Sequence, residues 1–248
     1  MINKTLIFIL LLATSCEGVN NISEKKIPLE EKNEVVNSEF QNILDSAGVN
    51  GSILILQDNI YYSNDFEWAK KGRLPASTFK IPNSIVALEL NVIKNDSTLI
   101  EWDGKPRYQK RWEQDLTFKE AFHYSCVPCY QEIARTIGVK RMDHYMNELN
   151  YGSMQFDSTN LDMFWLEGAS EISQHDQINF LKTFNEQGLP ISERTYSIMQ
   201  RMMIIEETEE YVLRGKTGWS VQGDIDNCWF VGYVKTEKGF CYFATNIE

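Results

Sequence analysis

Apolar and polar positions divide the chain into a strand-rich start, a helical middle and a strand-rich end. Near the start, apolar runs at 52–56 and 60–62 flank Asp58-Asn59, a pair typical of tight turns. This pattern predicts a β-hairpin. A short helix is expected just before it, at 40–46, because Gly48 follows and glycine commonly ends helices.

Helical spacing of apolar residues and residue types that cap helices predict helices through the middle of the chain. The expected helices are 77–91, 118–123, 128–136, 141–149, 173–184 and 192–203. Between 151 and 168 the chain is rich in Gly, Ser, Asn and Asp, which indicates a long loop.

The end of the chain returns to strand-like runs at 211–215, 228–234 and 240–245, with a turn at 237–239. Strands at both ends of a helical middle predict an α+β fold. We expect one antiparallel β-sheet packed with helices, plus an all-helical region, with helix 77–91 between the two.

Composition and charge narrow the functional classes. With 248 residues, 43% of them hydrophobic, the chain is long enough to bury a substantial core. The formal net charge is -11, and no basic stripe is visible that would neutralise phosphates. Nucleic acid and anionic membrane surfaces are therefore not expected as partners.

Residues 1–16 have the pattern of an export signal. Lys4 precedes the apolar run 6–12, which is too short to span a membrane, and small residues then lead to Cys16. Cys16 also resembles the lipidated cysteine of bacterial lipoproteins, so cleavage and lipid anchoring both stay open. Residues 17–37 are polar and are interpreted as a tether, and 38–248 as a single catalytic domain. The expected location is the periplasm or the bacterial envelope.

Five cysteines include Cys126 and Cys129, spaced as in some redox or metal pairs. A second pair with metal-binding spacing is missing and the chain has only three histidines, so no metal site is predicted. The cysteines other than Cys16 are interpreted as small buried hydrophobic residues. An oxidising compartment permits a disulfide without requiring one.

The segment Ser77-Thr78-Phe79-Lys80 is the main candidate for chemistry. Helical spacing of three places the Ser77 hydroxyl and the Lys80 amine on one face, a turn apart. A serine nucleophile needs a base, and a lysine serves only if its pKa is lowered. The apolar neighbours predict burial, which lowers a lysine pKa.

A serine and a lysine three residues apart also occur by chance on solvated helices, so the motif needs further support. Three later segments supply it: Lys216-Thr217-Gly218, Ser125-Cys126-Val127 and Phe164-Trp165-Leu166-Glu167-Gly168. Alone, they are explained equally well as a strand end, a helix cap and an aromatic loop anchor.

In this order, the segments resemble the class D serine β-lactamases, the oxacillinase family. The resemblance covers about 64–246, and the approach segment Phe66-Glu67-Trp68-Ala69 and the strand Phe230-Val231-Gly232-Tyr233 also carry it. It implies the fold shared by serine β-lactamases and penicillin-binding transpeptidases. It further implies hydrolysis of β-lactam antibiotics through a serine acyl-enzyme, and hence antibiotic resistance.

The resemblance also implies a role for each matching position. Ser77 would be the nucleophile, and Lys80, as N6-carboxylysine formed with carbon dioxide, the general base. Ser125 would pass a proton to the leaving nitrogen, and Trp165 would donate a hydrogen bond to the carbamate. The remaining expected roles are in substrate binding, at Val127, Leu166, Lys216, Thr217, Gly218 and Trp219.

Within that set, Val127 would wall off the carbamate, and Lys216 and Thr217 would face the substrate carboxylate. The backbone amides of Ser77 and Trp219 would form the oxyanion hole. No metal or other cofactor is implied beyond carbon dioxide or bicarbonate, and the partners are small-molecule β-lactams.

Two departures from the family pattern stand out. Ser153 follows Tyr151-Gly152 where the family usually has asparagine, and a modest effect is expected. The sequence given ends at Glu248, directly after the last strand, where the family continues into a helix that covers the sheet and an arginine that binds the substrate carboxylate. The C-terminal helix is therefore expected to be missing, and the domain to be truncated or its sheet partly uncovered.

Two other functions fit part of the pattern. An antibiotic-sensing receptor domain is acylated at the same serine but signals across a membrane, and it requires several spanning helices. A penicillin-binding transpeptidase uses a similar serine and lysine without a carbamate. Both alternatives predict acylation by β-lactams without efficient turnover. The apolar wall favours the carbamate chemistry; it consists of Phe79, Val127, Trp165 and Leu166.

Overall fold

The computed structural model describes residues 33–248, which form one compact unit from Lys32 onward. The expected export signal, Cys16 and most of the tether 17–37 lie outside the described residues. The last part of the tether is a strand, β1 (Asn33–Val36), which pairs in parallel with β3 (Ile60–Ser63). Ordered structure therefore begins earlier than the polar composition suggested.

Seven strands form one mixed sheet in the order β1-β3-β2-β9-β8-β7-β6. All its pairings except β1 with β3 are antiparallel. The remaining strands of this sheet are β2 (Gly51–Gln57), β6 (Ile204–Glu207), β7 (Tyr211–Gln222), β8 (Ile225–Thr236) and β9 (Gly239–Ile247). The short strands β4 (Leu99–Ile100) and β5 (Leu116–Thr117) pair separately.

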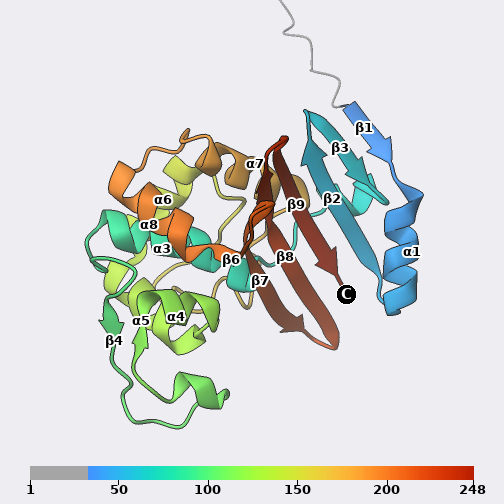
Figure 1. The fold of residues 1–248 in the computed structure, drawn as a ribbon. Helices are drawn as coiled ribbons and strands as arrows, with labels where there is room; N and C mark the ends of the chain where they lie inside the picture. The colour runs from blue at the N-terminus through green and yellow to red at the C-terminus, as the bar shows by residue number, and fades with distance from the viewer. Residues whose placement is uncertain (1–32) are drawn as a thin grey trace, which may run out of the picture. The chain divides into compact units, whose positions relative to one another are not determined.

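The helices fall into two groups, one near the sheet and one in a helical region beside it (Figure 1). Those near the sheet are α1 (Ser38–Ala47), α2 (Phe66–Lys70), the 3-10 turn η1 (Ala76–Phe79) and α7 (Gln174–Asn185). The helical region contains α3 (Lys80–Glu89), the 3-10 turn η2 (Lys110–Trp112), α4 (Phe118–His123), α5 (Val127–Ile137), α6 (Val139–Leu149) and α8 (Glu193–Met202). The α+β prediction is confirmed, and residues 33–248 contain no helix after β9.

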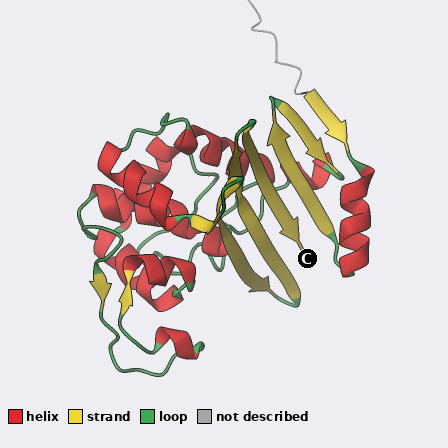
Figure 2. Cartoon of the chain, viewed as in Figure 1, coloured by secondary structure: helices red, strands yellow, loops and turns green. Residues whose placement is uncertain are grey.

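Turn η1, which contains Ser77, and helix α3, which begins at Lys80, lie at the boundary between the sheet and the helical region. Turn η1 contacts β7 and β8, while α3 contacts α5, α6 and α8. Figure 2 shows the same division, with most helices gathered beside the strands and α1 near β2. Helix α7 packs against β9 and β8, where Tyr242, Ala244 and Val231 are buried.

Other elements also differ from the sequence predictions. The helix expected over 77–91 begins as a 3-10 turn and becomes α-helical only at Lys80. Strand β7 continues to Gln222, so Lys216-Thr217-Gly218 lies in its middle and not at a strand end. Strand β6 was not expected; its residues, including Glu206 and Glu207, are partly or fully exposed at the sheet edge, where charges oppose unwanted strand pairing.

The outward face of β8 and β9 is only partly covered. Phe230 and Phe243 lie there with their ring centroids 4.9 Å apart, and both are half-buried. None of the helices in the described part of the chain is both long and apolar enough to cross a membrane.

Candidate active site

Ser77 and Lys80 occupy the turn between η1 and α3. In a 3-10 turn, side chains three residues apart eclipse each other, which brings these two closer than an α-helix would. The Lys80 amine donates a hydrogen bond to the Ser77 hydroxyl at 3.0 Å, and Lys80 is only 1% exposed. The sequence-predicted pairing of nucleophile and amine is therefore present.

Hydrogen bonds from three directions hold η1 in place. The backbone amide of Ala76, which has a positive φ of 51°, donates to the Trp165 carbonyl at 2.8 Å. The Thr78 hydroxyl donates to the Pro75 carbonyl at 2.6 Å and accepts from the Gln177 amide at 2.8 Å. These bonds fix the backbone on both sides of Ser77.

Gly218 explains how strand β7 approaches this turn. A Cβ atom at Gly218 would lie 3.2 Å from the Pro75 carbonyl oxygen and 3.2 Å from a Thr78 methyl group. The missing side chain of Gly218 lets β7 lie against η1. Its expected role in substrate binding stays a prediction.

Burial controls the protonation of Lys80. Desolvation lowers the pKa of the Lys80 amine well below its usual range, and the positive charge of Lys216 lowers it further. The amine therefore favours its neutral form, the form that can accept a proton or react with carbon dioxide. The ring centroid of Tyr130 lies 5.1 Å from Lys80 Nζ.

Ser125 and Lys216 form a second hydroxyl–amine pair. The Lys216 amine donates to the Ser125 hydroxyl and, at 3.0 Å, to the Thr217 carbonyl. Burial and then the positive charge of Arg111 lower the pKa of Lys216 to about 7. This lysine can therefore exchange a proton with Ser125 near neutral pH.

A cavity of about 340 Å³ opens between these pairs. Six of the residues chosen from sequence line it: Ser77, Ser125, Val127, Thr217, Gly218 and Trp219. Lys80 and Lys216 lie behind the two serines that they contact. Leu166 is half-buried against the hydrophobic core and is not among the lining residues, so its expected role in substrate binding stays a prediction.

Four lining residues were missed by sequence reasoning: Tyr108, Gln109, Arg111 and Trp112. They belong to an irregular segment around η2 with no apolar periodicity to mark it. Trp112 is the best anchored, because its indole donates to the Tyr124 carbonyl at 2.9 Å. Arg111 carries a positive charge into the cavity, with its guanidinium 5.7 Å from the Tyr124 ring centroid.

Trp165 has a buried donor available for a ligand. Its ring stacks on Phe79 with the centroids 5.3 Å apart, and its Nε1 atom has no hydrogen-bond partner within residues 33–248. A buried indole N–H normally has an acceptor. A carboxylated Lys80 would add acceptor oxygens to this apolar region, so the residues present fit that modification.

Ser153 does not disturb its loop. The Ser153 amide donates to the Glu171 carbonyl at 2.8 Å, and this bond needs no particular side chain. Gly152, with φ of 58°, lies so close to the Glu171 carbonyl that a Cβ atom would be 2.6 Å from its oxygen. These are backbone contacts that do not depend on the side chain at 153, and the modest effect expected of serine stays a prediction.

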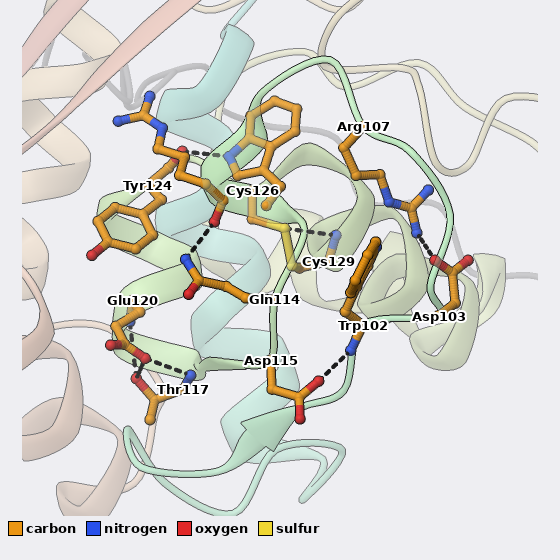
Figure 3. The surroundings of a disulfide bond; sticks show 12 residues. Trp102, Asp103, Arg107, Gln114, Asp115, Thr117, Glu120, Tyr124, Cys126 and Cys129 are labelled. Atoms are coloured by element: carbon orange, nitrogen blue, oxygen red, sulfur yellow. Dashed lines mark hydrogen bonds and ion pairs between the residues drawn. A yellow bond between two sulfur atoms is a disulfide. The ribbon is translucent and has the colours of Figure 1, made fainter.

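Cys126 and Cys129 form a disulfide at the start of α5, as Figure 3 shows. Their interpretation as simple buried hydrophobic residues was therefore wrong, although Cys126 is indeed buried. Cys228 and Cys241 are free. The described part of the chain has no group of three or more His, Cys, Asp or Glu residues placed to hold a metal ion.

Comparisons with known proteins agree with this geometry. A family model described as the penicillin binding protein transpeptidase domain matches residues 46–248. Beta-lactamase OXA-10 from Pseudomonas aeruginosa is 38% identical over 217 residues, covering 86% of this chain and 81% of that protein. The crystal structure of the class D β-lactamase YbXI from Nostoc superimposes with a TM-score of 0.81 at 42% identity, covering 83% of this chain and 87% of that one.

A more distant relative is the regulatory protein BlaR1 from Bacillus licheniformis. It is 28% identical over 252 residues, which covers 99% of this chain but only 42% of the regulatory protein.

Proposed function

The chain belongs to the class D serine β-lactamases, and we propose that Ser77 is its nucleophile and a carboxylated Lys80 its general base. The observation that supports this most directly is the buried Lys80 amine, 3.0 Å from the Ser77 hydroxyl. Carbon dioxide bound to that amine would supply a carboxylate base at neutral pH. Trp165 Nε1 would donate a hydrogen bond to it.

The acylation step follows from the two serine–lysine pairs. Ser77 Oγ attacks the β-lactam carbonyl carbon as its proton passes to the Lys80 side chain. The backbone amides of Ser77 and Trp219 stabilise the oxyanion. When the C–N bond breaks, Ser125 gives its proton to the leaving nitrogen, and Lys216 replaces that proton.

Deacylation reuses the same base. A water molecule loses its proton to the Lys80 side chain and attacks the ester carbonyl, which frees Ser77 and releases the opened acid. Val127 limits access of other water to the base, and Thr217 and Lys216 hold the substrate carboxylate. Hydrolysis of the ester distinguishes this enzyme from a target that stays acylated.

Turnover of nitrocefin, a chromogenic β-lactam, tests the proposal with and without added bicarbonate. We expect many turnovers per enzyme and a higher rate when bicarbonate is added after its removal. A mass spectrum after brief penicillin exposure should show the acyl group on Ser77, and Ser77→Ala should show none. A single stoichiometric burst under both conditions would contradict the hydrolytic mechanism.

A sensor or transpeptidase function is the second candidate, supported by the similarity to regulatory protein BlaR1 and by the transpeptidase family match. In that case penicillin would acylate Ser77 and the adduct would persist for hours. The lifetime of the adduct in the same mass spectra separates the two functions.

Export of the enzyme is also proposed, on the basis of residues 1–16. Lipid anchoring at Cys16 predicts that the protein partitions with membranes and that Cys16→Ala releases it into the soluble periplasmic fraction. Labelling of cells with a radioactive fatty acid, followed by precipitation of the enzyme, measures this directly.

A further inference from the structure

The disulfide Cys126–Cys129 lies within the motif that supplies Ser125. Cys126 joins two helices: its amide donates to the Ala121 carbonyl of α4 at 2.9 Å, and its sulfur accepts from the Cys129 amide of α5 at 3.3 Å. The disulfide adds a covalent link between the same two residues. The junction of α4 and α5 is therefore fixed at Cys126 (Figure 3).

Ser125 precedes this link in an unfavourable backbone conformation. Its φ is 50°, in the left-handed region that residues with a Cβ atom seldom adopt. Its amide donates to the Phe122 carbonyl at 3.1 Å, which restrains one side of the residue. On the other side the restraint comes from Cys126. The direction of the Ser125 hydroxyl toward Lys216 thus depends on this junction.

The far end of the disulfide is attached to a well-anchored helix. Tyr130, next to Cys129, is fully buried, and its hydroxyl lies 2.7 Å from the Ser84 hydroxyl of α3. Helix α3 also carries Lys80. The disulfide therefore connects the Ser125 backbone to the same framework that holds the nucleophile's base.

General stabilisation is a weaker explanation for this disulfide. A disulfide stabilises a fold mainly by restricting the unfolded chain, and this effect grows with loop length. Cys126 and Cys129 are separated by only 3 positions, so the restriction of the unfolded chain is small. Its main effect is on local geometry.

The disulfide borders a cavity other than the catalytic one. Both cysteines line a second cavity of about 410 Å³, which also includes Trp102 and Arg107. Trp112 lines this cavity and the catalytic one, and so separates them. A small dithiol that attacks the disulfide from the second cavity need not enter the substrate site.

We propose that the Cys126–Cys129 disulfide is a positioning element that holds the Ser125 hydroxyl against Lys216 for proton transfer to the leaving nitrogen. This inference rests on the role proposed for Ser125. Reduction by a dithiol such as dithiothreitol proceeds through a mixed disulfide: two electrons and two protons pass to the cysteine sulfurs, and the reagent becomes a cyclic disulfide. The freed junction lets Ser125 leave its strained conformation.

The test compares acylation rates of the oxidised and reduced enzyme in a Cys228→Ser/Cys241→Ser background, which removes the free thiols of residues 33–248. Alkylation and mass spectrometry confirm the number of reduced thiols. The acylation rate is expressed per titrated active site. We expect reduction to slow this rate about tenfold and to leave the fraction of active sites unchanged. The variant Cys126→Ala/Cys129→Ala should be equally slow and insensitive to dithiothreitol.

The same comparison in Ser125→Ala shows whether the effect passes through Ser125. If it does, Ser125→Ala is slow and reduction slows it no further, because the two changes remove one function. Equal slowing of both enzymes by reduction, or no slowing of the enzyme with Ser125 intact, overturns the positioning role. If Ser125→Ala acylates at the normal rate, the proton-transfer role proposed for Ser125 itself is wrong.

Discussion

The amine of Lys80 is held against the hydroxyl of Ser77, 3.0 Å away, at the point where a 3-10 turn becomes an α-helix. Both side chains are buried, yet Ser77 still lines the catalytic cavity while Lys80 does not. A neutral amine behind an accessible hydroxyl is the arrangement that a serine nucleophile requires.

Replacement of Lys80 by alanine should remove the base from both chemical steps. We expect acylation to slow by about 10²- to 10⁴-fold, the usual contribution of a positioned general base. Any acyl-enzyme that forms should persist. Stopped-flow nitrocefin kinetics and mass spectrometry measure the two steps. Lys94→Ala, at an exposed lysine beyond α3, is the control and should keep normal rates; a normal rate in Lys80→Ala would contradict the assignment.

Trp165→Phe should keep the aromatic stack on Phe79 but lose the buried N–H donor. A hydrogen bond to a charged group contributes about 1.5–3 kcal/mol, so the bicarbonate concentration for half-maximal turnover should rise roughly ten- to a hundredfold. Titration of nitrocefin turnover with bicarbonate measures this. Trp102→Phe is the control, because it removes an indole that donates to the Lys105 carbonyl instead. Its bicarbonate dependence should stay normal. An unchanged titration in Trp165→Phe would exclude the indole as the donor.

The sequence predicted the fold where local patterns and tertiary packing agree. The hairpin of β2 and β3 was expected from Asp58-Asn59, and both residues adopt the positive φ that such tight turns require. Helix α7 was expected over 173–184, and its cap is present: the Ser173 hydroxyl accepts from the Asp176 amide. In these cases one short segment contains the signal.

Other parts of the site depend on contacts distant in the sequence. Spacing of three suits an α-helix and a 3-10 turn equally, so the close approach of Ser77 and Lys80 was not predictable in detail. Beyond Gly215, the polar residues of β7 do not show a strand pattern, so this part of the strand was not predicted. It forms because β7 pairs with β8. The wall containing Arg111 and Trp112 is irregular, and its only local signal is the aromatic content of 108–112.

Arg111→Gln should shift the pH dependence of the enzyme. A nearby cation disfavours a protonated lysine, so removing Arg111 raises the pKa of Lys216 from about 7. Burial, the larger cause, remains, and a rise of about half a unit is reasonable for one partly solvated charge. The decrease in kcat/KM above neutral pH, as Lys216 loses its proton, should therefore begin at higher pH.

The pH–rate profile of nitrocefin hydrolysis measures that shift. Lys110→Gln is a matched control, because it removes a positive charge from the adjacent residue, whose side chain is 89% exposed and outside the cavity. Its profile should match that of the unmodified enzyme. A shift of Arg111→Gln toward lower pH would contradict the electrostatic coupling of Arg111 and Lys216.

Gly232→Ala tests the close packing of the strands that carry Lys216. Gly232 pairs with Gly215 across β7 and β8, and a Cβ atom at Gly232 would lie 2.1 Å from the Arg214 carbonyl oxygen and 2.8 Å from the Gly215 Cα atom. Both obstacles are backbone, so the strands themselves must separate. We expect a loss of about 1–3 kcal/mol in the free energy of unfolding. Activity should also decrease, because Lys216 follows Gly215 directly.

Urea unfolding and nitrocefin turnover, measured on the same samples, compare this variant with Val221→Thr. Val221 is 48% exposed near the end of β7, so that substitution should change stability by no more than about 0.5 kcal/mol. If Gly232→Ala matches the control in both measurements, the two backbones must be able to separate without cost. The tight β7–β8 pairing would then not be what positions Lys216 at Ser125.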